Sequence, residues 1–193
     1  MTKSIKYIGD NMNIKIIKLI AIINIFILSF PAHFLYEFLP STFISIFFPV
    51  NESIFEHMKI IFTSTLIYGI IDYLIIKLNN IKYNNFLFQL FFTSFISIPI
   101  YLIIYLPIRL IFGEYLIISI ILLFITYLIS QIISYYILTT KTIPYLNILS
   151  IPLIIIIYLI FAYSTYNPPK NFFFYDTTTN TYGILKERVN PNN

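Results

Sequence analysis

The residues that could do chemistry are few and lie in one short part of the chain. There are only two histidines, His33 and His57, and three glutamates, Glu37, Glu52 and Glu56, lie between or beside them. Imidazole and carboxylate groups are zinc ligands, and catalytic zinc sites use three of them and leave a position for water. The chain has no cysteine, which excludes disulfide bonds, thiolate catalysis and cysteine-based zinc sites.

We predict one polar site, facing outward from the membrane, from these residues and their polar neighbours. Its candidate members are His33, Glu37, Asn51, Glu52, Glu56, His57 and Lys59. For a divalent metal ion, the predicted ligands are His33, Glu56 and His57. The spacing contains no His-Glu-x-x-His motif, and a structural alternative stays open. Ser53 and Glu56 have the spacing of a helix capping box, and Glu56 and Lys59 are three residues apart, so they are able to pair on one helix.

The elements that must position these residues are membrane helices. The chain is 59% hydrophobic and 10% charged, with a mean hydropathy of +0.85, whereas soluble domains carry about 25% charged residues. Its apolar stretches reach about 20 residues, the length that crosses a bilayer core. We therefore predict an all-α polytopic membrane protein, a bundle of about five transmembrane helices. The expected spans are 14–38, 53–77, 86–106, 114–138 and 143–166.

The positive charges indicate how such a bundle is oriented. With five spans, most lysines fall on the side of the N-terminus, which is the cytoplasmic side by the positive-inside rule. We expect a basic cytoplasmic tail (1–13), a transmembrane helical domain (14–166) and an extracytoplasmic C-terminal tail (167–193), in a bacterial plasma membrane. The net charge of +4 then reflects lysines on the cytoplasmic side of the membrane. The expected partner is therefore the lipid bilayer, and no nucleic acid is expected to bind.

Within the second span, helical periodicity predicts two polar stripes. One contains Glu52, Glu56, Lys59 and Thr63, and the other contains Ser53, His57, Ser64, Tyr68 and Asp72. A helix with two polar stripes is expected at the centre of the bundle. Asp72 is expected to be neutralised by Lys77, Pro107 to end the third span, and the segment 175–183 to pack over the outer ends of the first two spans.

Two blocks of the sequence also resemble a known family. The blocks are Pro49-Val50-Asn51-Glu52-Ser53-x-x-Glu56-His57-x-Lys59 and Asp176-x-x-Thr179-Asn180-x-Tyr182-Gly183. They are similar to an uncharacterised family of small multi-pass membrane proteins from Firmicutes, classed as a domain of unknown function. The resemblance implies the membrane architecture and the location of the site, and it implies no reaction.

Two classes of function are compatible with the sequence. In the first, the polar cluster serves a metal-assisted enzyme or a carrier of a small solute or proton. In the second, the protein is a structural or partner-binding membrane subunit whose polar residues only fix helix packing. The residue types alone do not assign a reaction.

Overall fold

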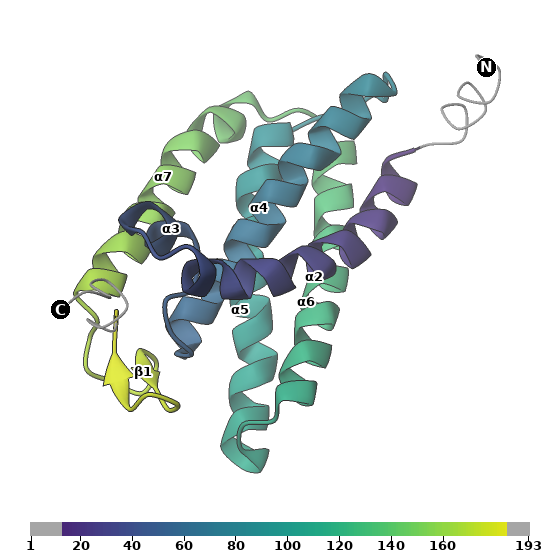
Figure 1. Ribbon diagram of the computed structural model, residues 1–193. Helices are drawn as coiled ribbons and strands as arrows, with labels where there is room; N and C mark the ends of the chain where they lie inside the picture. The colour runs from purple at the N-terminus through teal and green to yellow at the C-terminus, as the bar shows by residue number, and fades with distance from the viewer. Residues whose placement is uncertain (1–12, 185–193) are drawn as a thin grey trace.

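The computed structural model describes residues 13–184, which form a helical bundle (Figure 1). Five helices are long and apolar enough to cross a membrane: α2 (Ile14–Phe38), α4 (Ile54–Leu78), α5 (Phe86–Phe112), α6 (Leu116–Thr139) and α7 (Pro144–Tyr166). A short helix, α3 (Thr42–Phe47), lies between α2 and α4, and the two-residue strands β1 (Tyr175–Asp176) and β2 (Thr181–Tyr182) form a hairpin. The predicted all-α polytopic bundle is confirmed. Most of the predicted basic tail, residues 1–12, lies outside the described residues.

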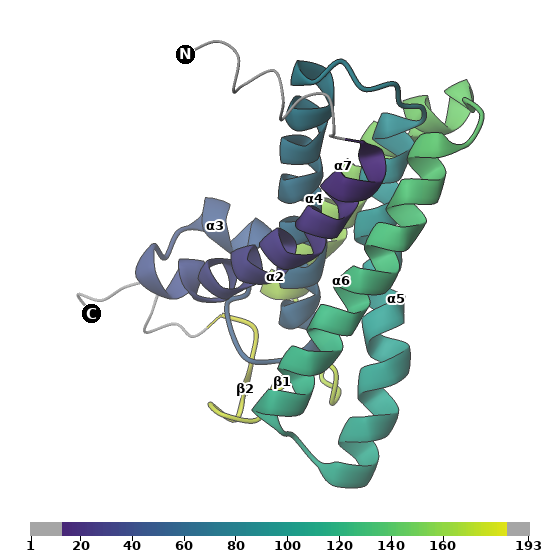
Figure 2. The ribbon, with the colours of Figure 1, turned by 90° about the vertical axis from the view of Figure 1, so that its right-hand side faces the viewer.

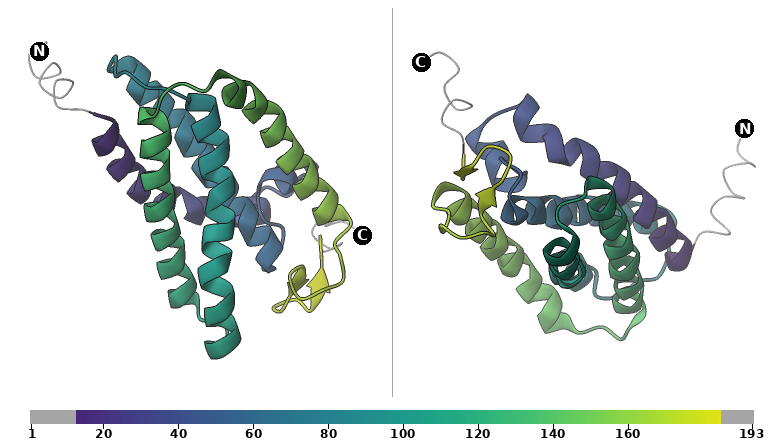
Figure 3. Two further views of the ribbon diagram at one scale, coloured as in Figure 1. Left: turned by 180° about the vertical axis from the view of Figure 1, so that it is seen from behind. Right: turned by 90° about the horizontal axis from the view of Figure 1, so that it is seen from below.

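The elements meet at two ends of the bundle. Figure 1 shows the start of α4, the α5–α6 turn, the end of α7 and the β hairpin toward one end, which we call the tail end. The connections 79–85 and 140–143 lie at the opposite end, which we call the loop end. Because the chain crosses the bundle five times, the start of α2 and the end of α7 lie toward opposite ends (Figure 3, left).

The second span, α4, is the most buried of the five. Within its most apolar stretch 67% of the residues are buried, against 39% or less in the other spans. One polar face carries Lys59 and Thr63 toward α3 and α7, and the opposite one carries Tyr68 and Asp72 toward α2. This burial confirms the central position predicted from the two stripes, since neither polar face is left to lipid.

The predicted partner of Asp72 was wrong. Its carboxylate pairs with Lys18 of α2 at 2.5 Å, and both side chains are buried. Lys77 instead lies over the ring of Tyr73, 5.7 Å from its centroid. Lys77 is five residues after Asp72, which turns it about 140° around the helix, whereas Lys18 faces Asp72 directly across the α2–α4 contact.

The predicted end of the third span at Pro107 was also wrong, because α5 continues to Phe112. The helix contains Pro99 and Pro107 and ends where Gly113 takes a positive φ of 86°. Each proline removes one backbone donor, and membrane helices tolerate this where neighbouring groups compensate. The longer helix carries Arg109 in its last turn, at the tail end.

The connection from α2 to α4 folds back against α7 through α3. The Ser45 hydroxyl lies 2.8 Å from the hydroxyl of Tyr166, and Phe47 packs on Tyr158 with ring centroids 4.6 Å apart. Irregular backbone at membrane depth needs partners inside the protein. The Ser45 carbonyl accepts from Lys59 Nζ at 2.7 Å, and the Phe47 carbonyl accepts from the Thr63 hydroxyl at 2.8 Å. These bonds fix the path by which the chain enters α4.

The segment after α7 returns across the tail end (Figure 3, right). The Phe55 N–H donates to the Phe173 carbonyl at 3.0 Å, and Phe174 stacks on Phe55 with centroids 4.5 Å apart. Gly183 has a φ of +66°, and a Cβ there would lie 2.9 Å from the Thr165 carbonyl oxygen of α7. The predicted segment 175–183 itself contacts the residues just before the second span, through Asp176 with Glu52 and Gly183 with Asn51, and Gly183 lies close to α7. Among the described residues, the predicted contact with the first span is not one of its hydrogen bonds.

Candidate metal site

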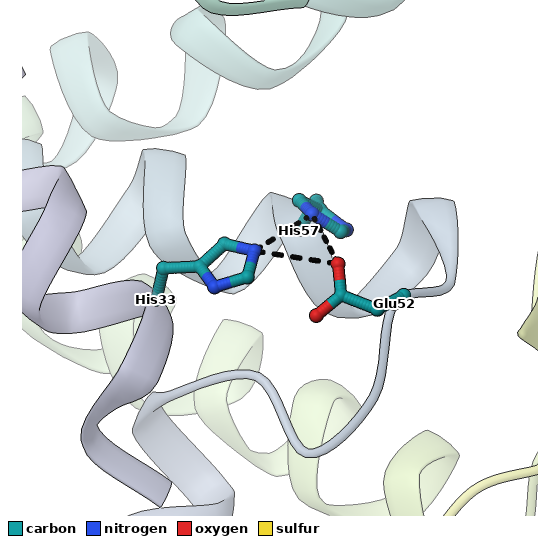
Figure 4. Close-up of side chains that lie close together, drawn as sticks. All are labelled: His33, Glu52 and His57. Atoms are coloured by element: carbon teal, nitrogen blue, oxygen red, sulfur yellow. Dashed lines mark hydrogen bonds and ion pairs between the residues drawn. The ribbon is translucent and has the colours of Figure 1, made fainter. Parts of the chain in front are cut away.

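Three side chains from different parts of the chain converge at the tail end (Figure 4). The Nε2 atoms of His33 and His57 are 3.2 Å apart, and each lies 3.4 Å from the Glu52 Oε2. Among the described residues, these three form a group of histidines and carboxylates placed to hold one metal ion. We call His33, Glu52 and His57 the triad. His33 comes from α2, Glu52 precedes α4, and His57 lies in the first turns of α4.

The backbone sets the orientation of the His57 ring. The His57 Nδ1 lies 2.9 Å from the Ser53 carbonyl, the carbonyl at the start of α4. A carbonyl only accepts, so Nδ1 carries the proton and the lone pair of the neutral ring is on Nε2. This is the arrangement in which a histidine binds a metal through Nε2 while its other N–H is held by the protein.

His33 is placed by α2 and by two neighbouring rings. Its ring lies 4.7 Å from Phe34 and 5.1 Å from His57, measured between centroids. Its Nε2 makes the contacts with the triad, whereas its Nδ1 is buried and has no hydrogen-bond partner among the described residues. His57 is therefore the more firmly oriented of the two imidazoles.

Glu52 is held by its backbone and reaches the histidines with its side chain. Its N–H donates to the Asp176 Oδ2 at 3.2 Å, and its carboxylate is 45% exposed. Contact with His33 lowers the pKa of the Glu52 carboxyl, burial opposes this, and the charges of His57 and His33 lower it further. The carboxylate form, which is the form that binds cations, is therefore favoured.

Asp176 forms the centre of the turn that holds Glu52. Its side chain is buried, and its two oxygens accept hydrogen bonds from Thr178 and Thr179 as well as from Glu52. Burial raises the pKa of the Asp176 carboxyl, but the hydrogen bonds from Thr178, Thr179 and Glu52 outweigh it, so the net shift is downward. The charged turn of the C-terminal segment thus fixes the backbone next to the triad.

Glu56, a predicted ligand, lies in a different cluster. Its carboxylate accepts from Lys59 Nζ at 2.7 Å, from the Thr165 hydroxyl at 2.8 Å and from the Val50 N–H at 3.0 Å. Lys59 and Glu56 are both almost fully buried. The hydrogen bonds of Glu56 and Lys59 all go to other groups of the protein, and they join α3, α4 and α7. Both carboxylate oxygens of Glu56 are therefore engaged away from the histidines.

The remaining predicted members do not join the triad. Glu37 is exposed on α2. Asn51 is structural, because its amide donates to the Gly183 carbonyl at 2.8 Å and its oxygen accepts from the Ser53 N–H at 2.9 Å. The predicted capping box forms only in part. Ser53 accepts from the Glu56 N–H at 3.3 Å, whereas the Glu56 carboxylate binds Val50 and Lys59.

Glu52 as the converging carboxylate and Asp176 as its support were not predicted from the sequence. A signal for Glu52 was present, since Ser53 is a favoured helix-capping residue and thus places Glu52 outside the helix. No sequence signal paired Asp176 with Glu52, because 124 positions separate them.

The spacing of the triad matches one coordination geometry. Three ligands of a tetrahedral ion, each about 2.0–2.1 Å from the metal, lie about 3.3 Å apart. Three ligands on one face of an octahedral ion at the same distance would lie about 2.9 Å apart. The observed 3.2, 3.4 and 3.4 Å agree with three corners of a tetrahedron. Two imidazoles and one carboxylate are also a ligand set found in catalytic zinc sites.

Two cavities meet at the triad. One, of about 450 Å³, runs between α2, α4 and α6 and is mainly apolar, with Phe30, Ile60 and Leu123 in its wall. The other, of about 320 Å³, lies under the C-terminal segment and is the more polar of the two, because Arg109, Glu114 and Thr178 line it together with tyrosine and aliphatic side chains. Glu52 and His57 border both cavities. A fourth coordination position would therefore be reachable from two chemically different spaces.

Comparison with known proteins gives a family and no activity. No curated protein and no solved structure shows significant similarity to the chain. The model of DUF6512, described as a family of unknown function, matches residues 6–184. The match covers the five spans, the triad and the β hairpin, so the chain belongs to the DUF6512 family.

Proposed function

We propose that the protein is a multi-pass membrane protein that binds one divalent metal ion of the zinc type through the triad and uses it for hydrolysis. The observation that supports this is the near-equilateral triangle of two imidazole nitrogens and one carboxylate oxygen, with the spacing of a tetrahedral face. Glu52 replaces Glu56 in the ligand set predicted from the sequence.

The chemistry follows from an open fourth position. Zinc held by three protein ligands lowers the pKa of a bound water to about 7 and polarises a carbonyl oxygen. The cavities that border His57 and Glu52 supply space for both the water and a substrate. The residues of the chain contribute the ligands, the fixed His57 tautomer and the support of Glu52 by Asp176.

The alternative role, in which polar residues only fix helix packing, fits other polar residues of this chain. Lys59 forms an ion pair with Glu56 and donates a hydrogen bond to the backbone of α3. Lys18 and Asp72 form an ion pair that joins α2 to α4. These four side chains are buried and serve packing. The triad differs because its carboxylate is half-exposed and it borders two cavities.

For the setting of the protein, we propose the plasma membrane of a bacterium with the loop end in the cytoplasm. The support is the lysines of the loop end, Lys77, Lys82 and Lys141. In this orientation the triad and the C-terminal segment belong to the outer half of the membrane protein.

Metal content tests the proposal. The detergent-purified protein, incubated with Zn²⁺ and desalted, should retain one metal ion per chain by elemental mass spectrometry. His57→Ala and Glu52→Gln should each lose it, while the matched control Glu37→Gln, an exposed carboxylate on α2, should keep it. A wild-type protein that retains no metal, or a Glu52→Gln variant that retains it fully, would overturn the proposal.

A further inference from the structure

The two cavities at the triad differ in polarity, and they adjoin along a shared wall of Glu52, His57, Tyr101, Leu116 and Ser119. The apolar cavity is walled by Phe30 and Phe34 of α2, Ile60 of α4 and Ile120 and Leu123 of α6. The polar cavity contains Arg109, paired with Glu114, and the hydroxyls of Thr177 and Thr178. Glu52 and His57 stand at the boundary between them. Both volumes are in the range of pockets that hold small molecules.

The apolar cavity is formed where two helices separate. Figure 2 shows α2 and α6 crossing at an angle, so that they diverge toward the tail end. The wall residues Phe30 and Leu116 are 41% and 76% exposed on the outer surface of the bundle. In a membrane, that surface faces the acyl chains of lipids. The space beside His33 and His57 is therefore next to lipid and apolar.

Resting on the proposed function, we infer that the substrate is an acyl lipid of the surrounding bilayer, whose ester or amide bond is hydrolysed at the triad. The acyl chain occupies the cavity between α2 and α6, and the headgroup occupies the cavity under the C-terminal segment. An acyl lipid has its carbonyl at the junction of the apolar chain and the polar headgroup. The triad lies at the junction of the apolar and the polar cavity.

The reaction balances with water as the only co-reactant. The oxygen of the metal-activated water forms a bond to the acyl carbon, and the bond from that carbon to the headgroup oxygen or nitrogen breaks. The electron pair of the broken bond stays on the headgroup atom, which takes up the water-derived proton. The products are a fatty acid, which can return to the bilayer between α2 and α6, and a headgroup alcohol or amine.

The polar cavity restricts the headgroup. Its charged groups are Arg109 of α5 and Glu114, which follows α5, and they pair with each other. Thr177 also donates to the Glu114 carboxylate at 3.3 Å. A cavity that presents a neutralised pair and hydroxyls is suited to a neutral or zwitterionic headgroup. An anionic headgroup would have to displace Glu114 from Arg109.

The test uses the full chain, loaded with Zn²⁺, in vesicles of phosphatidylcholine that contain phosphatidylethanolamine, phosphatidylglycerol, diacylglycerol and N-acyl sphingosine. Mass spectrometry should detect released fatty acid from a neutral or zwitterionic lipid. Ile120→Trp, which fills the apolar cavity, should lower the rate at least about tenfold, the scale on which misplaced substrates lose rate. Ile121→Trp, on the neighbouring residue whose side chain is 52% exposed and outside the cavity wall, is the matched control and should keep the wild-type rate.

The outcomes separate this inference from the proposed function. One metal ion per chain with no fatty acid released from any lipid of the panel would overturn the substrate and leave the metal site standing. An unchanged rate in a metal-loaded Ile120→Trp variant would overturn the placement of the acyl chain. If Ile120→Trp fails to fold, a lipid with a photoreactive acyl chain replaces it. Its label should fall on Phe30 or Leu123 of the wild-type protein, and labelling only outside the cavity would contradict the inference.

Discussion

At the scale of single residues, the two glutamates that begin the α4 region have opposite roles. Glu56 is buried and bound to Lys59, Thr165 and the backbone of Val50. Glu52, four positions earlier, is half-exposed and contacts both histidines. Removing one partner of a buried pair leaves the other charge without compensation, whereas a half-exposed carboxylate is replaced at little cost.

Glu56→Gln should therefore destabilise the fold, and Glu52→Gln should not. We expect Glu56→Gln to lower the free energy of unfolding by about 3–5 kcal/mol, the cost of breaking a buried pair. Heating in detergent followed by size-exclusion chromatography measures the loss of folded protein. The double variant Glu56→Gln/Lys59→Met should be more stable than Glu56→Gln alone, because it no longer buries an unpaired ammonium group. Equal melting of Glu56→Gln and wild type would contradict this assignment.

The pH dependence of metal binding belongs to the same scale. Contact with His33 lowers the pKa of the Glu52 carboxyl, so its contribution is present above the ordinary carboxyl pKa and is lost only as the pH falls through the lowered value. Histidine changes charge between about pH 5 and 8, and a metal ligand must be deprotonated. Because a metal ligand must be deprotonated, Zn²⁺ binding should weaken as the pH falls, and the lowered pKa of the Glu52 carboxyl keeps this ligand charged to a more acidic pH than an ordinary glutamate. Equilibrium dialysis at several pH values measures this. Full retention at the acidic end would argue against histidine ligands.

At the scale of elements, the C-terminal hairpin supports the triad from behind. Asp176 accepts the Glu52 N–H and four further hydrogen bonds from Thr178 and Thr179. Asn180 closes the turn with a φ of 56°, a left-handed conformation that asparagine adopts readily. The hairpin is thus a small rigid unit whose charged centre faces the start of α4.

Asp176→Asn should weaken metal binding without removing a ligand. The amide places an NH₂ group where one carboxylate oxygen now accepts, so Glu52 loses its support. Loss of such outer partners typically costs about 10–100-fold in metal affinity. Competition with a fluorescent zinc chelator gives the affinity. The control Asn180→Gly keeps the left-handed backbone and should bind like wild type. A purely structural hairpin would show the reverse pattern, with reduced folded yield and unchanged affinity in Asp176→Asn.

The helices were predictable from sequence and the ligand set was not, for identifiable reasons. The first span was predicted at 14–38 and α2 is Ile14–Phe38, because apolar length alone defines a membrane helix. Glu52 was predicted to lie on one stripe of the second helix, but it lies before the helix begins. Ser53, the residue after it, has φ −70° and ψ 155°, so the helix begins only at Ile54. Helical periodicity does not extend backward past the cap, so the predicted stripe that placed Glu52 beside Glu56 was wrong at Glu52.

At the scale of the whole molecule, α4 lies at the centre of the bundle, and the candidate metal site lies at only one of its two ends. The two connections 79–85 and 140–143 lie at the loop end, and the triad lies toward the tail end. The chain has no cysteine, so single cysteines report sidedness without background labelling.

Lys82→Cys at the loop end and Lys170→Cys after α7 test the orientation. Both positions are exposed. A membrane-impermeant maleimide added to intact cells should label Lys170→Cys alone, and lysis should expose Lys82→Cys. The reverse pattern would invert the orientation, and labelling of both in intact cells would be incompatible with five crossings.

The charged side chains of α4 have partners that are synthesised at different times. A charged residue in the middle of a nascent membrane helix costs about 2.5–3.5 kcal/mol on insertion. When α4 leaves the ribosome, Lys18 is already present in α2 and can receive Asp72. Thr165, which binds the Glu56–Lys59 pair, lies in α7 and emerges some hundred residues later. Asp176, which steadies Glu52, follows α7. The contacts of the Glu56–Lys59 pair with Thr165 and of Glu52 with Asp176 are therefore complete only after all five helices and the C-terminal segment have been made.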